Sequence, residues 1–71
     1  FYFETNFGHD VIEDFEVGID TINMRAVCGL RSFADLAVTQ DGQDTVITLG
    51  DNTITLLDVT ASQIDRHDVL A

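Results

Sequence analysis

A short pattern of glycine, any residue, aspartate, any residue and a branched apolar residue recurs along the chain and limits what it can fold into. GHDVI at 8–12, GIDTI at 18–22 and GQDTV at 42–46 match the pattern, and GDNTI at 50–54 matches it with asparagine in place of the acid. Glycine allows a sharply turned backbone, the aspartate caps the turn, and the branched residue suits a strand. We therefore expect short strands, each preceded by a tight turn.

The residues between these turns alternate between apolar and polar side chains, which is the pattern of half-buried strands. Ile22 and Met24, for example, would lie on the same face of one strand. Aromatic and branched side chains pack well on a pleated sheet. The five phenylalanines are accordingly expected to anchor the core: Phe1, Phe3, Phe7, Phe15 and Phe33.

Two hairpins are expected in the second half of the chain. Asp41-Gly42 separates alternating runs at 37–40 and 44–49, and Asp-Gly between two such runs is a strong hairpin signal. A second turn at 50–52 leads into the run at 53–59. The side chains expected to share faces of these strands are Thr45, Ile47 and Leu49 on one strand, and Ile54 and Leu56 on the next.

Two further segments favour helical turns. Ser32 precedes FADL, and Asp35 three residues later completes a pattern like a capping box. The last stretch, 61–71, is expected to be a short helix that Thr60 or Ser62 caps. The sequence thus predicts a single, mainly β, sandwich-like domain of five or six short strands with one or two short helical turns.

The charge of the chain restricts its partners. Thirteen acidic residues stand against three basic ones, which gives a formal net charge of -10 over 71 residues. Such a field repels phosphate backbones and attracts cations, so we expect no nucleic-acid partner. No apolar run is long enough to span a membrane. Cys28 is the single cysteine, which excludes an internal disulfide, and we expect it to be a buried structural thiol.

No arrangement of residues in the sequence is typical of catalysis. The chain contains no HExxH motif, no nucleophile elbow and no glycine-rich phosphate loop. His9 and His67 lack cysteine or histidine partners at metal-ligand spacing, so both are expected at the surface. We therefore expect this chain to be non-catalytic.

The recurring pattern also occurs within the nonapeptide GGxGxDxUx, in which U is a large apolar residue and which forms calcium-binding parallel β-rolls. The segment TNFGHDVIE at 5–13 keeps Gly8, Asp10 and Ile12 of this motif but lacks its leading glycines. The copies are ten, twenty-four and eight residues apart rather than a steady nine. This chain alone therefore cannot build a continuous roll.

The order of the motifs resembles the region that follows the last repeats of RTX (repeats-in-toxin, haemolysin-type) proteins. The similar stretches are FYFETNFGHDVIEDFEVGIDTINMRAV, SFADLAVTQDGQDTVITLGDNTITLLDV and the closing DVLA. Where the family favours Asp-Leu after the second motif, this chain has Asn23-Met24. The resemblance covers essentially the whole chain.

This resemblance implies the non-catalytic carboxy-terminal region of a secreted protein, which caps a calcium-binding β-roll. Residues 1–24 would form degenerate roll turns, 25–60 capping strands and hairpins, and 61–71 the terminal helix with the secretion signal. The implied partner is the set of upstream repeats in the same polypeptide, and the parent could be a secreted hydrolase, protease or epimerase. The residues presented to the last repeat would be Phe1, Phe3, Ile12 and Phe15.

The family resemblance also implies a calcium site and a signal read by type I secretion machinery. Calcium prefers carboxylate and carbonyl oxygens, and the candidate ligands are Asp10, Asp14, Gly8 and Asn6. Asp10 could instead cap its turn and Asp14 could be solvated, as Asp20 and Asp44 are expected to stabilise turns. The candidate secretion signal is Asp68, Val69, Leu70 and Ala71.

The start of the chain and its function each allow a further interpretation. The chain begins at Phe1 within strand-like sequence, which suggests a fragment of a longer polypeptide. An alternative function is a stand-alone extracellular β module that binds a polysaccharide or a protein ligand. That alternative predicts an exposed groove and binding that does not depend on calcium.

Overall fold

The computed structural model describes residues 1–70, which form a mainly β domain with two short 3-10 turns, as the sequence predicted. The alternating runs become strands, and the turns between them carry the glycines. The strands are β1 (Tyr2–Glu4), β2 (His9–Ile12), β3 (Ile22–Ala26), β4 (Ala37–Asp41), β5 (Asp44–Leu49), β6 (Asn52–Leu56) and β7 (Val69–Leu70). The 3-10 turns are η1 (Phe33–Asp35) and η2 (Ala61–Gln63).

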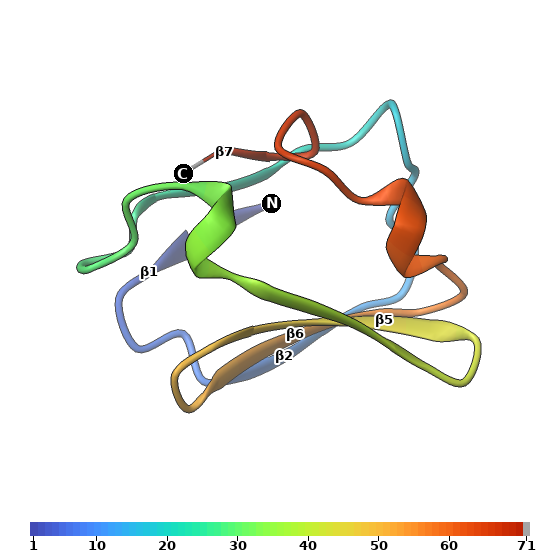
Figure 1. Cartoon of the computed structure of the whole chain (residues 1–71), viewed down its shortest axis with the longest axis horizontal. Helices are drawn as coiled ribbons and strands as arrows, with labels where there is room; N and C mark the ends of the chain where they lie inside the picture. The colour runs from blue at the N-terminus through green and yellow to red at the C-terminus, as the bar shows by residue number, and fades with distance from the viewer. Residues whose placement is uncertain (71) are drawn as a thin grey trace.

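The strands form two sheets that face each other across the core (Figure 1). The first sheet has the order β1-β3-β7, and both of its pairings are parallel. The second has the order β2-β6-β5-β4, in which β2 and β6 are parallel and the other pairs antiparallel. This arrangement confirms the predicted sandwich-like domain.

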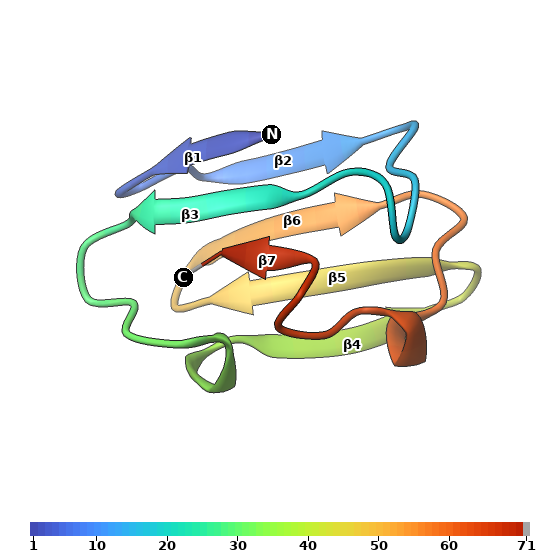
Figure 2. The ribbon, with the colours of Figure 1, turned by 90° about the horizontal axis from the view of Figure 1, so that it is seen from above.

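The first three strands trace one turn of a coil. The chain runs along β1 in the first sheet, crosses to β2 in the second, and returns to β3, which lies parallel to β1. Figure 2 shows β1 and β3 pointing one way and β2 the other. Because β2 also pairs in parallel with β6, the turn is joined to the rest of the domain in both sheets.

The remaining strands of the second sheet form the two predicted hairpins. Asp41 pairs with Asp44 across the first turn, and Leu49 pairs with Asn52 across the second. Gly42 has a φ of 63°, a left-handed conformation that glycine adopts at little cost. Local turn chemistry is therefore sufficient to explain this part of the fold.

The core fills the space between the two sheets. The predicted inward faces of β5 and β6 are confirmed, since Thr45, Ile47, Ile54 and Leu56 are fully buried. Burying one such aliphatic side chain contributes about 1.5–3 kcal/mol. The first sheet supplies fully or almost fully buried side chains on the opposite side, namely Ile22, Met24 and Val69.

The phenylalanines differ from the prediction in how deeply they lie. Phe15 is buried and Ile12 is buried on β2, so neither is presented to an upstream repeat as expected. Phe1 is instead 49% exposed, and its ring lies 6.0 Å from that of Phe15 between centroids. The alternation of β2 turns Ile12 inward, and the loop that follows β2 brings Phe15 into the core beside Phe1.

Two further expectations are wrong in detail. Cys28 is exposed rather than buried, because it lies at a turn where its backbone N–H donates to the Thr5 hydroxyl at 2.7 Å. Within 61–70, the described part of the terminal segment, the chain forms the η2 turn and strand β7 instead of the helix expected over 61–71. Ile64 after that turn is extended and buried, and the chain then turns to place Val69 beside Ile22.

Candidate functional site

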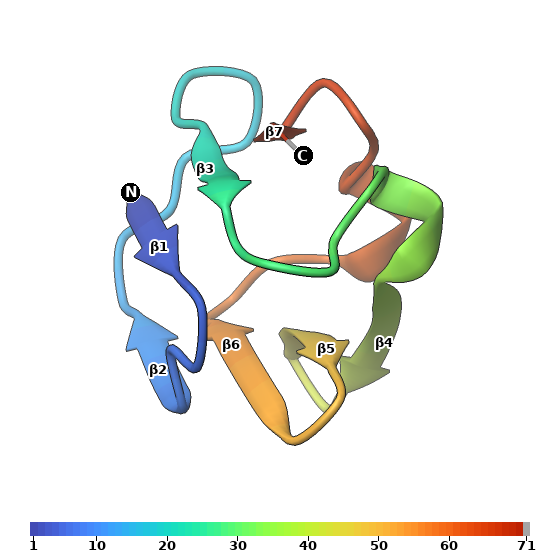
Figure 3. The ribbon, with the colours of Figure 1, turned by 90° about the vertical axis from the view of Figure 1, so that its left-hand side faces the viewer.

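Two strands form open edges on the same side of the domain. β1 is the edge of the first sheet and β2 is the edge of the second, and Figure 3 shows them one above the other. Among residues 1–70 no strand pairs with the outer side of either one. Edge strands carry backbone N–H and C=O groups that can accept a further strand. We call this side of the domain, formed by Tyr2–Glu4 and His9–Ile12, the β1–β2 edge.

Exposed apolar side chains accompany these edges. Tyr2 on β1 is 62% exposed and Val11 on β2 is 60% exposed. Both are outward-facing neighbours of inward-facing residues, because successive side chains of a strand point to opposite faces. Together with the half-exposed Phe1 they give the β1–β2 edge an apolar character within a strongly acidic chain.

The turn that joins β1 to β2 contains two of the candidate calcium ligands. Asn6 has a φ of 61° and Gly8 a φ of 76°, so both adopt the left-handed region. The Gly8 N–H donates to Asn52 Oδ1 at 2.9 Å, and the Gly8 carbonyl accepts from the Thr53 N–H at 2.8 Å. These bonds continue the β2–β6 pairing, so Gly8 has a clear structural role.

The two candidate carboxylates lie on and after β2. Asp10 is half-buried and pairs with Ile54, whereas Asp14 is exposed in the bend that follows the strand. Within residues 1–70 the structure brings no three His, Cys, Asp or Glu side chains together as a metal-binding group. Calcium takes about 6–8 oxygen ligands. The candidate residues therefore do not form a closed site by themselves, and their role as ligands stays a prediction.

Other aspartates have the turn-stabilising role expected of them. The Asp20 carboxylate accepts the Glu16 N–H at 2.9 Å, and the Asp44 carboxylate accepts the Asp58 N–H at 2.9 Å. Asp58 itself has a φ of 57°. The aspartates of the second and third Gly-x-Asp copies thus accept backbone N–H groups in this structure.

The candidate secretion signal is built into the first sheet. Asp68 is only 7% exposed, and one of its carboxylate oxygens accepts the Asp65 N–H at 3.0 Å. Val69 is 2% exposed and pairs with Ile22, while Leu70 pairs with Asn23. Ala71 lies outside the described residues. The sequence pattern did not indicate that these residues form a strand, because the run is too short to show alternation.

The sequence did not predict that Asn52 contacts the turn between β1 and β2. Its side-chain oxygen receives the Gly8 N–H, and its side-chain nitrogen donates to the Leu49 carbonyl at 3.3 Å. It therefore joins the β5–β6 turn to the start of β2. The asparagine at the acid position of the fourth Gly-x-Asp copy was the available signal, since an amide can both donate and accept.

The geometry defines a class of protein domain: a mainly β, two-sheet domain that starts with one parallel coil turn and continues as an antiparallel meander. No family model matches the chain, and no curated protein sequence does. Among solved structures it is similar to the extracellular lipase LipA from Serratia marcescens, with a TM-score of 0.81 and 25% sequence identity. The match covers 99% of this chain but 11% of that one, so the chain spans a small part of the lipase.

Proposed function

We propose that this chain is the carboxy-terminal cap of a secreted β-roll protein. The observation that carries the proposal is the parallel coil turn β1–β2–β3, whose two edge strands lie on one side of the domain. A β-roll is built from such turns, in which the chain alternates between two parallel sheets. In this proposal β1 and β2 are the last turn of the roll, and the strands from β4 onward end it.

The β1–β2 edge is the surface on which upstream repeats of the same polypeptide would stack. A preceding turn would add one parallel strand beside β1 and another beside β2, which would satisfy their outer backbone groups. It would also cover part of Tyr2 and Val11, which are exposed in this chain. Terminal repeats of other solenoids close an otherwise open stack in the same way.

The opposite side of the domain supports the capping role because it is poorly suited to further stacking. There the second sheet ends in β4, which is antiparallel to its neighbour. The Gln40 side chain at the end of β4 accepts the Ala61 N–H at 2.6 Å and donates to the Asp44 carbonyl at 2.8 Å. The first sheet ends in β7, a strand of two residues, and very short edge strands discourage further pairing.

The proposed location is outside the cell, and the proposed exporter is type I secretion machinery. The similarity to an extracellular lipase supports the location. Within residues 1–70 no helix is both long and apolar enough to cross a bilayer. Because Asp68 and Val69 are buried in the folded domain, the exporter would have to read Asp68–Ala71 before the first sheet forms.

In this proposal, calcium binds only where an upstream turn of the roll supplies further ligands. Asp10 and Asp14 would each supply carboxylate oxygens from the β2 end of the β1–β2 edge, and the preceding turn would supply the remaining oxygens. No catalytic role is proposed for the residues of this chain. The activity of the parent, which could be a hydrolase, would reside in its other parts, as the small share of the lipase that is matched suggests.

The capping role can be tested by joining designed repeats to the chain. A series of at least about three consensus GGxGxDxUx repeats, the number that a repeat stack needs for stability, is placed before Phe1. Calcium-dependent folding is followed by circular dichroism. We expect the fusion to fold at lower calcium concentration than the repeats alone. Equal midpoints for the fusion and for the repeats alone would contradict the capping role.

A control variant identifies the surface responsible. Val11→Lys places a charge on the outer face of β2, where the side chain is 60% exposed, and should leave the isolated domain folded. In the fusion, Val11→Lys should raise the calcium concentration needed for folding toward that of the repeats alone, if the repeats stack against this edge. Thr39 is an exposed position on β4 at the far side of the same sheet. Thr39→Lys should therefore leave the calcium concentration needed for folding of the fusion unchanged.

A further inference from the structure

One pocket of the domain gathers all the arginines of the chain. It has a volume of about 440 Å³ and is lined by Arg25, Arg31 and Arg66 together with five other residues. These are the three basic side chains in a chain with thirteen acidic ones. They come from three separate segments: the end of β3, the loop before η1, and the turn before β7. We call this the arginine pocket.

No carboxylate is among the described residues that line the arginine pocket. The acidic residues nearest to the arginines in sequence accept backbone N–H groups. The Asp35 carboxylate receives the N–H groups of Arg31 at 2.9 Å and Ser32 at 3.2 Å. On either side of Arg66, Asp65 receives the His67 N–H at 2.8 Å and Asp68 receives the Asp65 N–H at 3.0 Å. Neighbouring acids therefore cap turns and do not line the pocket.

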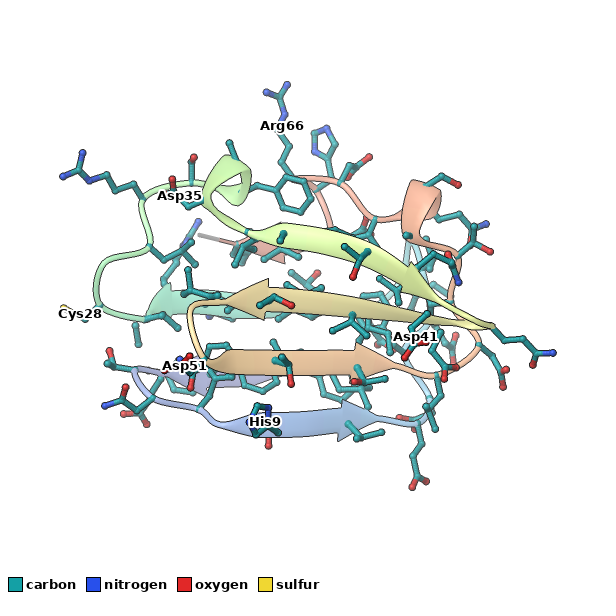
Figure 4. The ribbon with its side chains drawn as sticks, turned by 60° about the horizontal axis from the view of Figure 1, so that its bottom comes forward. His9, Cys28, Asp35, Asp41, Asp51 and Arg66 are labelled. Carbon is teal, nitrogen blue, oxygen red and sulfur yellow. The ribbon has the colours of Figure 1, made fainter. Side chains whose placement is uncertain are left out.

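The rest of the lining is mostly apolar. Val69 is 2% exposed, Phe33 and Leu70 are half-buried, and Ala34 and Ser32 complete the wall. Figure 4 shows the Arg66 side chain extending outward from the domain, on the same side as Asp35 at the end of η1. Small-molecule sites commonly combine apolar walls with a few polar groups, in volumes of about 300–1,000 Å³. The arginine pocket has both properties.

We propose that the arginine pocket binds a small organic anion with a short apolar body, such as a medium-chain carboxylate. Guanidinium groups match carboxylate and phosphate oxygens with paired N–H donors, and the wall of Phe33, Val69 and Leu70 contacts the apolar part. Nucleic acid does not fit this chemistry, because the net charge of -10 repels a polyanion. The site lies at the β7 side of the first sheet, away from the β1–β2 edge, so the proposal stands independently of the capping role.

The test is a titration of the isotope-labelled chain followed by amide NMR. The probes are hexanoate, acetate, inorganic phosphate and hexanol, all at constant ionic strength. We expect saturable shifts with hexanoate at Ser32, Phe33, Val69 and Leu70, weaker binding of acetate and phosphate, and none of hexanol. Equal shifts with hexanoate and hexanol would show a purely apolar contact. Equal affinities for phosphate and hexanoate would show a site that recognises the anionic group alone. Either result would overturn the proposal.

The variants separate a local site from the overall charge. Arg31→Gln and Arg66→Gln, both at exposed positions, should each weaken hexanoate binding about tenfold, the effect of losing one charge-assisted hydrogen bond. Gln43→Glu in the exposed β4–β5 turn changes the net charge by the same amount and should leave binding unchanged. The amide spectrum of each variant reports whether it is folded. Equal weakening by all three variants, or by none, would contradict an arginine-lined site.

Discussion

The Thr45 hydroxyl donates a hydrogen bond of 2.6 Å to the Val59 carbonyl inside the core. Thr45 is fully buried on β5, and Val59 follows β6 and is 3% exposed. The bond ties the chain that leaves the second sheet back to its central strand. The same carbonyl also accepts from Gln40 Nε2 at 3.4 Å, so side chains of two strands of the second sheet, β4 and β5, hold the path toward η2.

Thr45→Val removes the hydroxyl and keeps the shape of the side chain. We expect a loss of about 1 kcal/mol in the free energy of unfolding, the net contribution of one hydrogen bond, because the longer bond from Gln40 Nε2 still satisfies the Val59 carbonyl. Urea denaturation followed by circular dichroism measures it. Thr48→Val, on the outer face of the same strand, is the control and should change stability by less than about 0.5 kcal/mol. Similar losses for both variants would show that the Thr45 bond adds no stability beyond the Gln40 bond to the same carbonyl.

Gly8→Ala tests the turn between β1 and β2. Gly8 has a φ of 76°, and an added Cβ would meet nothing within 4 Å, so the penalty comes from the backbone alone. We expect a loss of about 1–2 kcal/mol in the free energy of unfolding. Gly8→Asn should lose less, because asparagine tolerates the left-handed region. If alanine and asparagine behave alike, backbone strain is not the reason for glycine at this position.

Asp10→Asn and Asp14→Asn test whether the last turn takes part in calcium binding. In the isolated chain, we expect added calcium to affect the melting temperature of the unmodified chain and of both variants equally. Two carboxylates cannot complete a shell of about 6–8 oxygens. In the fusion with upstream repeats, each variant should require more calcium for folding than the unmodified fusion. Circular dichroism during calcium titration measures both effects. A calcium response that the variants abolish in the isolated chain would instead place a complete site within it.

Deletion of Asp68–Ala71 tests the secretion signal, with a folding control. We expect the deletion to reduce export of a passenger protein that carries this chain at its carboxy terminus. Ile22→Ala leaves these residues intact but should destabilise the domain by about 2–5 kcal/mol, because Ile22 is fully buried beside Val69. Export of this variant should persist if the exporter reads the unfolded segment. Immunoblots of culture medium and cells measure both, and equal loss in the two variants would point to a folding requirement.

Features of this fold that depend on neighbouring residues were predictable from the sequence, and features that depend on distant residues were not. The hairpins at Asp41-Gly42 and at 50–52 were predictable because turn chemistry and alternation act over a few residues. The parallel pairs β1–β3 and β2–β6 join segments far apart in the sequence, and no local pattern specifies them. The same reason explains why the strand at Val69–Leu70 was not predicted.

The candidate sites were predictable to different degrees. The Gly-x-Asp pattern correctly located the turn at Gly8, but it could not show that the Gly8 carbonyl bonds to Thr53. The exposure of Cys28 was not predicted, because the apolar residues before it favoured a buried thiol although the segment forms a turn. The arginine pocket was not predicted, because its three cationic residues come together only through tertiary structure.

The central position of β3 in the first sheet links the two ends of the described chain. Its residue Asn23 pairs with Tyr2 on one side and with Leu70 on the other. During synthesis from the amino terminus, β3 can therefore acquire its first neighbour early but must wait for almost the whole sequence before it acquires the second. Before Val69 is synthesised, Ile22 lacks its neighbour in this sheet, so the first sheet can be completed only after β7 has been translated.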